Sequence, residues 1–530
     1  MAETSARFPD VFWSANVTEL FERAAYYSMA SFLVIYMGQL GLGAYWPSNL
    51  NSVLWTIVYF LPILSGTIAD QVGFRRSLLV AFVLLTAGYL LMGAPVWFGG
   101  AALAPIVHQE FTASPMLVAT LLAAIVLIGV GGSVIKPCIS GTMQKTAGAR
   151  VTLGFAIFYM IINIGSLVGR GVAFVVRTGS SLPAILTAVA ICAAVAGLII
   201  WLVYRSVESL GSQAGRVAMA LPFAALIVAG GLAIAWLLRH SAPAVRTGAG
   251  LSYIFAVAAV AAAVAFLVVL LFYREPAVAA GTPAKPWRSM GRILLDMVLV
   301  LRNPRFALFL GVMSGFWFLY NQVYNVLPLY AKRVVEASPA MDLYTAANPF
   351  VIVAFQLLIT AMFGKMRAVR SMVLGTVIIG LSMAINLFPV YSTGGVRALA
   401  AIGLPIGSVF LILTVALIAF GELFTSARMY EYIGALAPKG QEGLFLGYAS
   451  LPVAVGSLTG GPVGAFIFNE VMARDAVTRP DGLLELNPNS NALGWIILMA
   501  IGLLSALALW LFNRWLEKHP EPSAAAAVQA

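Results

Sequence analysis

Long, uninterrupted apolar runs are the dominant pattern along this chain. Fourteen of them are long enough to cross a bilayer as a helix, which takes ~20 residues, and they are continuous rather than alternating. The runs are expected to begin near Val11, Trp46, Ser77, Pro115, Val151, Ser181, Arg216, Gly250, Arg305, Met341, Ser371, Ala401, Glu442 and Ala492. The pattern predicts an all-α membrane protein with 14 spans.

The composition indicates that the surrounding solvent is lipid. Of the 530 residues, 61% are hydrophobic and 10% are charged, whereas soluble proteins carry about 25% charged residues. The two cysteines lie inside apolar runs, and the sequence shows no metal-ligand cluster, phosphate-binding loop or nucleophile with a histidine and a carboxylate. We therefore expect no enzyme activity, no metal and no cofactor.

Basic residues are distributed unevenly between the two ends of the predicted spans. With a cytoplasmic N-terminus, 19 of the 31 Lys and Arg residues lie inside, eight lie outside and four lie within spans. An excess of basic residues in cytoplasmic loops orients a membrane protein during insertion. This distribution predicts that both termini are cytoplasmic. It also accounts for most of the net charge of +11, so no nucleic-acid partner is expected.

The seventh and eighth predicted spans differ from the others. No Asp, Glu, Lys, Arg or His lies between Arg216 and Arg239, or between Arg246 and Arg274, and we interpret this pair as added, lipid-facing helices. Without them, residues 11–204 and 305–515 form two halves of six spans each. Residues 205–304 then hold the added pair and an amphipathic interfacial helix at 286–303, and residues 516–530 form a cytoplasmic tail. Two such bundles with a substrate site between them are an architecture of transporters.

Three charged residues lie within the first predicted span. Glu19, Glu22 and Arg23 are spaced so that they share one helix face, and Lys136 of the fourth span lies at a similar depth. A charge at bilayer depth costs at least ~2.5 to 3.5 kcal/mol, so it usually faces a cavity or a partner. One hypothesis is a static ion-pair latch between the first and fourth helices. The other is a proton-carrying site, because Arg23 alone cannot fully neutralise two buried carboxylates.

Charges in the other spans also have open interpretations. Glu422 lies near the middle of its span without a local partner, which favours an acidic group that faces the cavity. Arg428 and Glu431 are three residues apart and can neutralise each other on one helix. Arg170, near the outer end of the fifth span, either extends to the lipid headgroups or serves the interior.

Several segments carry recognisable motifs. Residues 19–23 read ExxER and are followed by two tyrosines, residues 66–76 read GTIADQVGFRR, and residues 129–140 read GVGGSVIKPCIS. Further matches are FYMIINIGSL at 158–167, ANPF around Asn348, and Gly421-Glu422 followed by residues 436–439. Together these segments resemble the proton-coupled oligopeptide transporter (POT) family of the major facilitator superfamily. The first motif is specific for the family, whereas GTIADQVGFRR indicates only the superfamily.

The resemblance implies a major facilitator fold of two six-helix bundles plus two extra central helices. It also implies symport of protons with di- and tripeptides across a bacterial inner membrane, by a monomer. Proton coupling would involve Glu19, Glu22, Arg23 and Lys136. The cytoplasmic side would be held closed by Asp70, Arg75 and Arg76. The peptide cavity would be lined by Tyr26, Tyr27, Tyr59, Lys136, Asn163, Trp317, Asn321, Asn348, Glu422 and Tyr448, with Glu422 facing the peptide amino group and Lys136 its carboxylate.

The chain departs from the family pattern at several positions. Ala30 stands where a basic residue usually helps to bind the carboxylate, and Ala24 stands where a phenylalanine usually follows ExxER. Asn321 replaces an acidic residue, and Ser426-Ala427 replaces Ser-Pro. A modified peptide, an amino-acid derivative or another organic anion is therefore an alternative substrate.

Two other functions are compatible with the sequence. A drug or organic-ion antiporter of the same superfamily can also have fourteen spans, although the motifs above argue against it. A sensing or structural membrane protein that no longer transports is the other alternative, and the retained intramembrane charges argue against that one.

Overall fold

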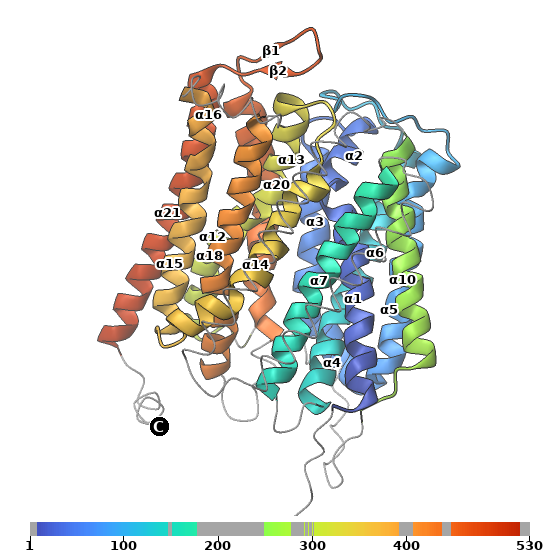
Figure 1. The fold of residues 1–530 in the computed structure, drawn as a ribbon, viewed down its shortest axis with the longest axis vertical. Helices are drawn as coiled ribbons and strands as arrows, with labels where there is room; N and C mark the ends of the chain where they lie inside the picture. The colour runs from blue at the N-terminus through green and yellow to red at the C-terminus, as the bar shows by residue number, and fades with distance from the viewer. Residues whose placement is uncertain are drawn as a thin grey trace, which may run out of the picture.

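Long helices standing side by side build the protein, as Figure 1 shows. The computed structural model describes residues 8–146, 151–177, 249–276, 301–391, 406–436 and 447–519, together with Gly291, Leu295 and Leu299. Within these ranges nine helices are long and apolar enough to cross a membrane, or ten if one bent pair counts as a span. Helices lie over every predicted span in the described ranges, which confirms the helical membrane fold. The sixth and seventh predicted spans, most of the helix at 286–303 and the end of the tail lie outside them.

The N-terminal bundle combines helices from the first part of the chain with one from its middle. Its elements are α1 (Asp10–Ala30), α2 (Leu33–Gln39), α3 (Trp46–Phe60), α4 (Pro62–Val72), α5 (Phe74–Trp97), α6 (Pro115–Thr146), α7 (Val151–Arg177), η3 (Ala249–Ser252) and α10 (Tyr253–Leu271). α3 and α4 form one span with a bend of 44°, because Pro62 interrupts the helical hydrogen bonds. Gly73 then joins α4 to α5 at φ +100°, a conformation that favours glycine.

The position of α10 differs from the predicted lipid-facing helix. It packs against α1, α5 and α7, and its buried side carries small residues such as Ala258, Ala262 and Ala265, which allow helices to approach closely. Val260 and Leu267 on the opposite side are exposed. One face of α10 is therefore part of the bundle, and only the other face is free to contact lipid.

The C-terminal bundle contains the remaining helices. They are α12 (Pro304–Asn321), η4 (Gln322–Tyr324), α13 (Val326–Tyr330), η5 (Ala331–Val335), α14 (Met341–Phe363), α15 (Ala368–Ser382), η6 (Met383–Leu387), α16 (Phe388–Tyr391), α18 (Ile406–Leu436), η7 (Tyr448–Ser450), α20 (Leu451–Phe466), η8 (Ile467–Met472) and α21 (Pro488–Lys518). Asn303 and Asn487 cap α12 and α21 by accepting hydrogen bonds from backbone N–H groups of the first turn. An antiparallel hairpin of β1 (Val477–Thr478) and β2 (Leu484–Glu485) lies at the upper end in Figure 1.

The two bundles contact each other mainly through α3 with α20 and through α7 with α14. Several polar contacts join them in the upper half of the molecule. Ser31 Oγ of the N-terminal bundle lies 2.6 Å from Thr345 Oγ1, and Asn51 donates a 3.1 Å hydrogen bond to the carbonyl oxygen of Tyr324. Tyr45 also donates a hydrogen bond to Glu470. α1 begins and α21 ends at the opposite, lower end (Figure 1). These polar contacts between the bundles therefore lie away from the start of α1 and the end of α21.

Gly169 of α7 determines how closely α7 approaches α1. A Cβ atom added there would lie 2.2 Å from the carbonyl oxygen of Ala24 and 2.7 Å from its Cα, and these backbone atoms cannot move aside independently. We expect Gly169→Ala to lower the unfolding temperature of the detergent-solubilised protein, through an overpacking cost of about 1 to 3 kcal/mol. Gly311→Ala in α12 is the matched control, because no heavy atom lies within 4 Å of its added Cβ. Equal shifts in the two variants would contradict the expectation.

Candidate transport site

The charged face of α1 is buried against its neighbours. Glu19 and Glu22 are 0% and 1% exposed, and Arg23 contacts both, with its Nε 3.3 Å from Glu19 Oε1. Arg23 donates a hydrogen bond to Glu22, whereas neither oxygen of Glu19 accepts one from any residue that the structure describes. One guanidinium thus serves two carboxylates, and Glu19 is the less well satisfied of the two. This arrangement suits a site that takes up and releases a proton.

Lys136 of α6 lies among aromatic side chains. Its ammonium donates a 3.5 Å hydrogen bond to the hydroxyl of Tyr430 in α18 and lies 6.0 Å from the centre of the Tyr59 ring. It is within electrostatic range of Glu19, but across the described ranges it forms no ion pair with either glutamate of α1. The static latch needs such a pair, so this geometry does not favour it. Lys136 instead contacts the opposite bundle.

Glu422 lies on α18 in the C-terminal bundle and is held by neutral groups. Its carboxylate accepts a 3.1 Å hydrogen bond from Asn348 Nδ2 and a 3.3 Å hydrogen bond from Ser426 Oγ. Tyr320 of α12 lies beside it. Tyr159 of α7, in the other bundle, packs against a cluster that contains Leu423, the residue after Glu422. No ion pair to Glu422 forms among the described residues. A buried carboxylate held only by neutral donors is able to receive a positively charged group of a ligand.

A row of aromatic rings connects the two bundles. From Tyr27 to Tyr26, Trp55, Tyr324, Tyr320 and Trp317 the successive ring centres are separated by 5.3, 5.9, 4.9, 6.4 and 5.2 Å. We call these six residues the aromatic row; it begins in α1, passes through α3 and ends at α12. Tyr59 stacks on Trp55 at 5.5 Å. Such rings offer apolar surface with a few polar tips, which suits ligands with varied side chains.

Three residues expected in the cavity are engaged in other contacts. Asn163 donates to the carbonyl oxygen of Tyr159 within α7. Asn321 donates to Ser457 Oγ of α20, 3.2 Å away, and so links two helices of the C-terminal bundle. Tyr448 packs against the Phe306 ring with centres 5.8 Å apart. A direct role of these three residues in ligand binding stays a prediction.

The expected gating residues make contacts within the N-terminal bundle. Asp70 Oδ1 lies 4.0 Å from the Lys145 ammonium, which joins α4 to α6. Arg75 donates to the carbonyl oxygen of Leu270 at the end of α10. These two contacts hold the loop motif against the N-terminal bundle. The gating role of Asp70, Arg75 and Arg76 stays a prediction.

Some residues of the site were not anticipated from the sequence. Trp55, Tyr159, Tyr320, Tyr324 and Tyr430 all lie beside the predicted residues. A usable signal was present: Trp55 with Tyr59, Tyr320 with Tyr324, and Tyr159 with Asn163 are each spaced four residues apart, which places both members on one helix face.

Two alternatives left open by the sequence are resolved by the structure. Arg170 is 1% exposed, so it does not extend to the lipid headgroups. Arg428 and Glu431 form an ion pair of 2.6 Å on α18, which confirms that these two charges neutralise each other locally.

Two helical bundles that enclose buried carboxylates, cations and an aromatic wall define the class: a secondary transporter with the major facilitator fold. A sequence model of the POT family matches residues 78–247, and similar proteins match along nearly the whole length of the chain. The chain is therefore similar to the POT family, over about a third of its length by the family model and over most of its length by single relatives.

Known proteins similar to this chain include named permeases and solved transporters. Dipeptide and tripeptide permease B of Photorhabdus asymbiotica is 23% identical over 96% of both chains. Dipeptide and tripeptide permease A of Escherichia coli is 25% identical over 90% of this chain and 87% of its own. A POT peptide transporter mutant in complex with alafosfalin has a TM-score of 0.62 at 19% identity, covering 96% of this chain and 95% of that one. A POT transporter in complex with 5-aminolevulinic acid also has a TM-score of 0.62, at 17% identity, covering 96% and 97%.

Proposed function

We propose that this protein is a proton-coupled symporter that imports di- and tripeptides, or related small peptide-like solutes, by alternating access. The observation that carries the proposal is the placement of opposite charges on the two bundles: Lys136 on α6 and Glu422 on α18, with the aromatic row spanning the interface. A short peptide is a zwitterion, so its two ends match these charges. A ligand that contacts both bundles stabilises the state in which they are drawn together around it.

The α1 cluster supplies the proton-binding group of this proposal. When Glu19 is deprotonated, Arg23 must neutralise two carboxylates, whereas after protonation it pairs with Glu22 alone. Protonation therefore changes the charge of the α1 cluster by one unit. This change is the link between proton uptake and substrate binding.

The named relatives support peptides as the substrate class. The permeases above are named for dipeptides and tripeptides, and solved structural relatives hold alafosfalin, 5-aminolevulinic acid and a thioalcohol-conjugated peptide. The drug or organic-ion antiporter has no comparable support. We further propose a location in a bacterial inner membrane with both termini cytoplasmic, a monomeric state, and no enzyme activity or cofactor other than the coupled proton.

Reconstitution into liposomes tests the proposed function. We expect purified protein to accumulate a labelled dipeptide when the vesicle interior is alkaline or electrically negative relative to the outside. Empty liposomes and an excess of unlabelled tripeptide are the controls for leakage and for specificity. Uptake that responds to neither gradient would contradict proton coupling, and the absence of any peptide uptake would contradict the substrate class.

Glu422→Gln tests recognition of the substrate amino group. Losing a charge-assisted contact to an ammonium group removes about 1.5 to 3 kcal/mol, so we expect the affinity for a free dipeptide to fall by about 10- to 150-fold. The N-acetylated dipeptide lacks this ammonium group, so its affinity should be equal in the wild type and the variant. Isothermal titration calorimetry with both peptides checks this; an equal loss for both would show that Glu422 does not read the amino group.

A further inference from the structure

Arg170 is a buried cation that the transport scheme above does not use. Its guanidinium donates to Thr345 Oγ1 at 2.9 Å, to the hydroxyl of Tyr324 at 3.1 Å, and to both oxygens of Ser166. All of these partners are neutral, and no carboxylate pairs with Arg170 among the residues that the structure describes. A buried charge without a counter-charge is destabilising. Such a cation is able to receive a negatively charged group of a ligand.

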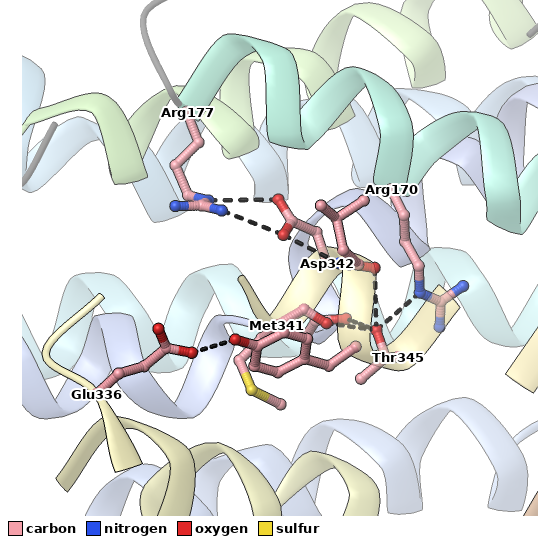
Figure 2. A network of polar contacts seen from close by, with 9 residues as sticks. Arg170, Arg177, Glu336, Met341, Asp342 and Thr345 are labelled. Atoms are coloured by element: carbon pink, nitrogen blue, oxygen red, sulfur yellow. Dashed lines mark hydrogen bonds and ion pairs between the residues drawn. The ribbon is translucent and has the colours of Figure 1, made fainter. Parts of the chain in front are cut away.

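The guanidinium of Arg170 lies at the aromatic row. Its central carbon is 4.5 Å from the centre of the Tyr27 ring, and its partner Tyr324 is another member of the row. Figure 2 shows that the terminal nitrogens of Arg170 point away from the ion pair between Arg177 and Asp342. Arg170 therefore belongs to the lining of the proposed substrate site rather than to that ion pair.

Arg170 also approaches the end of α1. The Thr345 hydroxyl that accepts from Arg170 is 2.6 Å from Ser31 Oγ, and Ser31 directly follows Ala30. Ala30 is buried, and a methyl group cannot bind an anion. The cation carried by α7 thus lies beside an uncharged position of α1.

The opposite charge lies one helical turn away along α14. Thr345, which contacts Arg170, precedes by three residues Asn348, which contacts Glu422. One helical turn rises about 5.4 Å. The guanidinium of Arg170 and the carboxylate of Glu422 are therefore held about one turn apart along α14, a separation comparable to the length of a short zwitterion.

We propose that Arg170, together with Lys136, binds the carboxylate end of the substrate. The proposal rests on the proposed function and makes Arg170 a specificity-determining residue. A guanidinium can bind a carboxylate through two parallel hydrogen bonds, which a lysine cannot do. On binding, the substrate carboxylate replaces the Tyr324 hydroxyl at Nη2 and provides the missing counter-charge.

A matched pair of ligands tests this role. Affinities of dialanine and dialanine amide, which differ only in the C-terminal charge, are measured by isothermal titration calorimetry on detergent-solubilised protein. We expect the wild type to prefer dialanine and Arg170→Gln to bind dialanine about 10- to 100-fold more weakly, with the affinity for the amide unchanged. Arg170→Lys is expected to keep part of the preference, because it keeps the charge but loses the planar fork.

A second variant keeps the test decisive if Arg170→Gln does not fold. In the double variant Ala30→Arg with Arg170→Gln, the cation is moved from α7 to α1, and we expect the preference for dialanine to return. The proposal is overturned if a folded Arg170→Gln protein keeps the wild-type preference, if it loses affinity equally for both ligands, or if the double variant has no preference. Wild-type protein that binds neither ligand would instead contradict the proposed function itself.

Discussion

Replacing Glu19 or Glu22 with glutamine is expected to abolish proton-driven accumulation of peptide while leaving counterflow exchange in place. Glutamine at position 19 has nearly the shape of the protonated carboxyl group but cannot release a proton. With glutamine at position 22, Glu19 becomes the remaining ion-pair partner of Arg23 and stays deprotonated. In either variant Arg23 retains one carboxylate partner, so the α1 cluster stays neutral and the bundles can still exchange substrate. Driven uptake, which requires the proton to bind and leave in each cycle, is lost. The measurement compares uptake under a pH gradient with exchange at equal pH in the same liposomes.

Glu431→Gln is the matched control for these two variants. Glu431 is also an ion-paired glutamate, but its side chain is 56% exposed, and its partner Arg428 also donates to the carbonyl oxygens of Phe363 and Gly364. We expect driven uptake to remain within about twofold of wild type, because an exposed pair contributes little. Normal driven uptake in both the Glu19 and the Glu22 variants would return the α1 cluster to a purely structural role.

Breaking the ion pair between Arg177 and Asp342 is expected to open the end of the transporter that is closed in this structure. Arg177 Nη2 lies 3.1 Å from Asp342 Oδ1, with side chains that are 4% and 0% exposed, and the pair joins α7 to α14 across the bundle interface (Figure 2). Removing one partner leaves an uncompensated charge that costs about 3 to 5 kcal/mol while it stays buried. Opening hydrates that charge, so Asp342→Asn should shift the equilibrium toward the open state by about 10²- to 5 × 10³-fold.

Spin-label distances detect this opening. Labels at Phe111, in the connection between α5 and α6, and at Val477, in β1, are at exposed positions on the two bundles. They should move apart in Asp342→Asn after the native cysteines are replaced. The charge swap Arg177→Asp with Asp342→Arg is expected to restore the short distance. Arg479→Gln, which breaks the half-exposed pair with Asp481, is the control and should leave the distances unchanged. An unchanged distance in Asp342→Asn would show that other contacts hold this end closed.

Features that depend on one helix could be predicted from the sequence, whereas contacts between helices could not. The shared face of Glu19, Glu22 and Arg23 follows from their spacing, as does the local pair of Arg428 with Glu431. The partner of Lys136 is Tyr430, 294 residues away, and helical periodicity contains no information about such a pairing.

The sequence of an apolar helix does not show which of its faces packs against other helices. In lipid, an apolar residue suits both the bilayer and a neighbouring helix, so the charge-free sequence of α10 could not show that one of its faces packs on α1 and α5. The position of Arg170 near the end of a span was likewise compatible with a side chain that points to the lipid headgroups or to the interior. Only the surrounding hydroxyl groups, which come from α7, η4 and α14, show that its side chain points inward.

The end of α10 carries a contact that limits how the central segment of the chain can vary. The Glu275 carboxylate accepts hydrogen bonds of 2.8 and 2.9 Å from the backbone N–H groups of Phe74 and Arg75 at the start of α5, where a negative charge is favoured. Arg75 in turn donates to Leu270 of α10. Leu270 and Glu275 thus hold the end of the GTIADQVGFRR loop in place. Without Glu275 the backbone N–H groups of Phe74 and Arg75 would lose this acceptor, so the sequence at the end of α10 and the loop are expected to vary together.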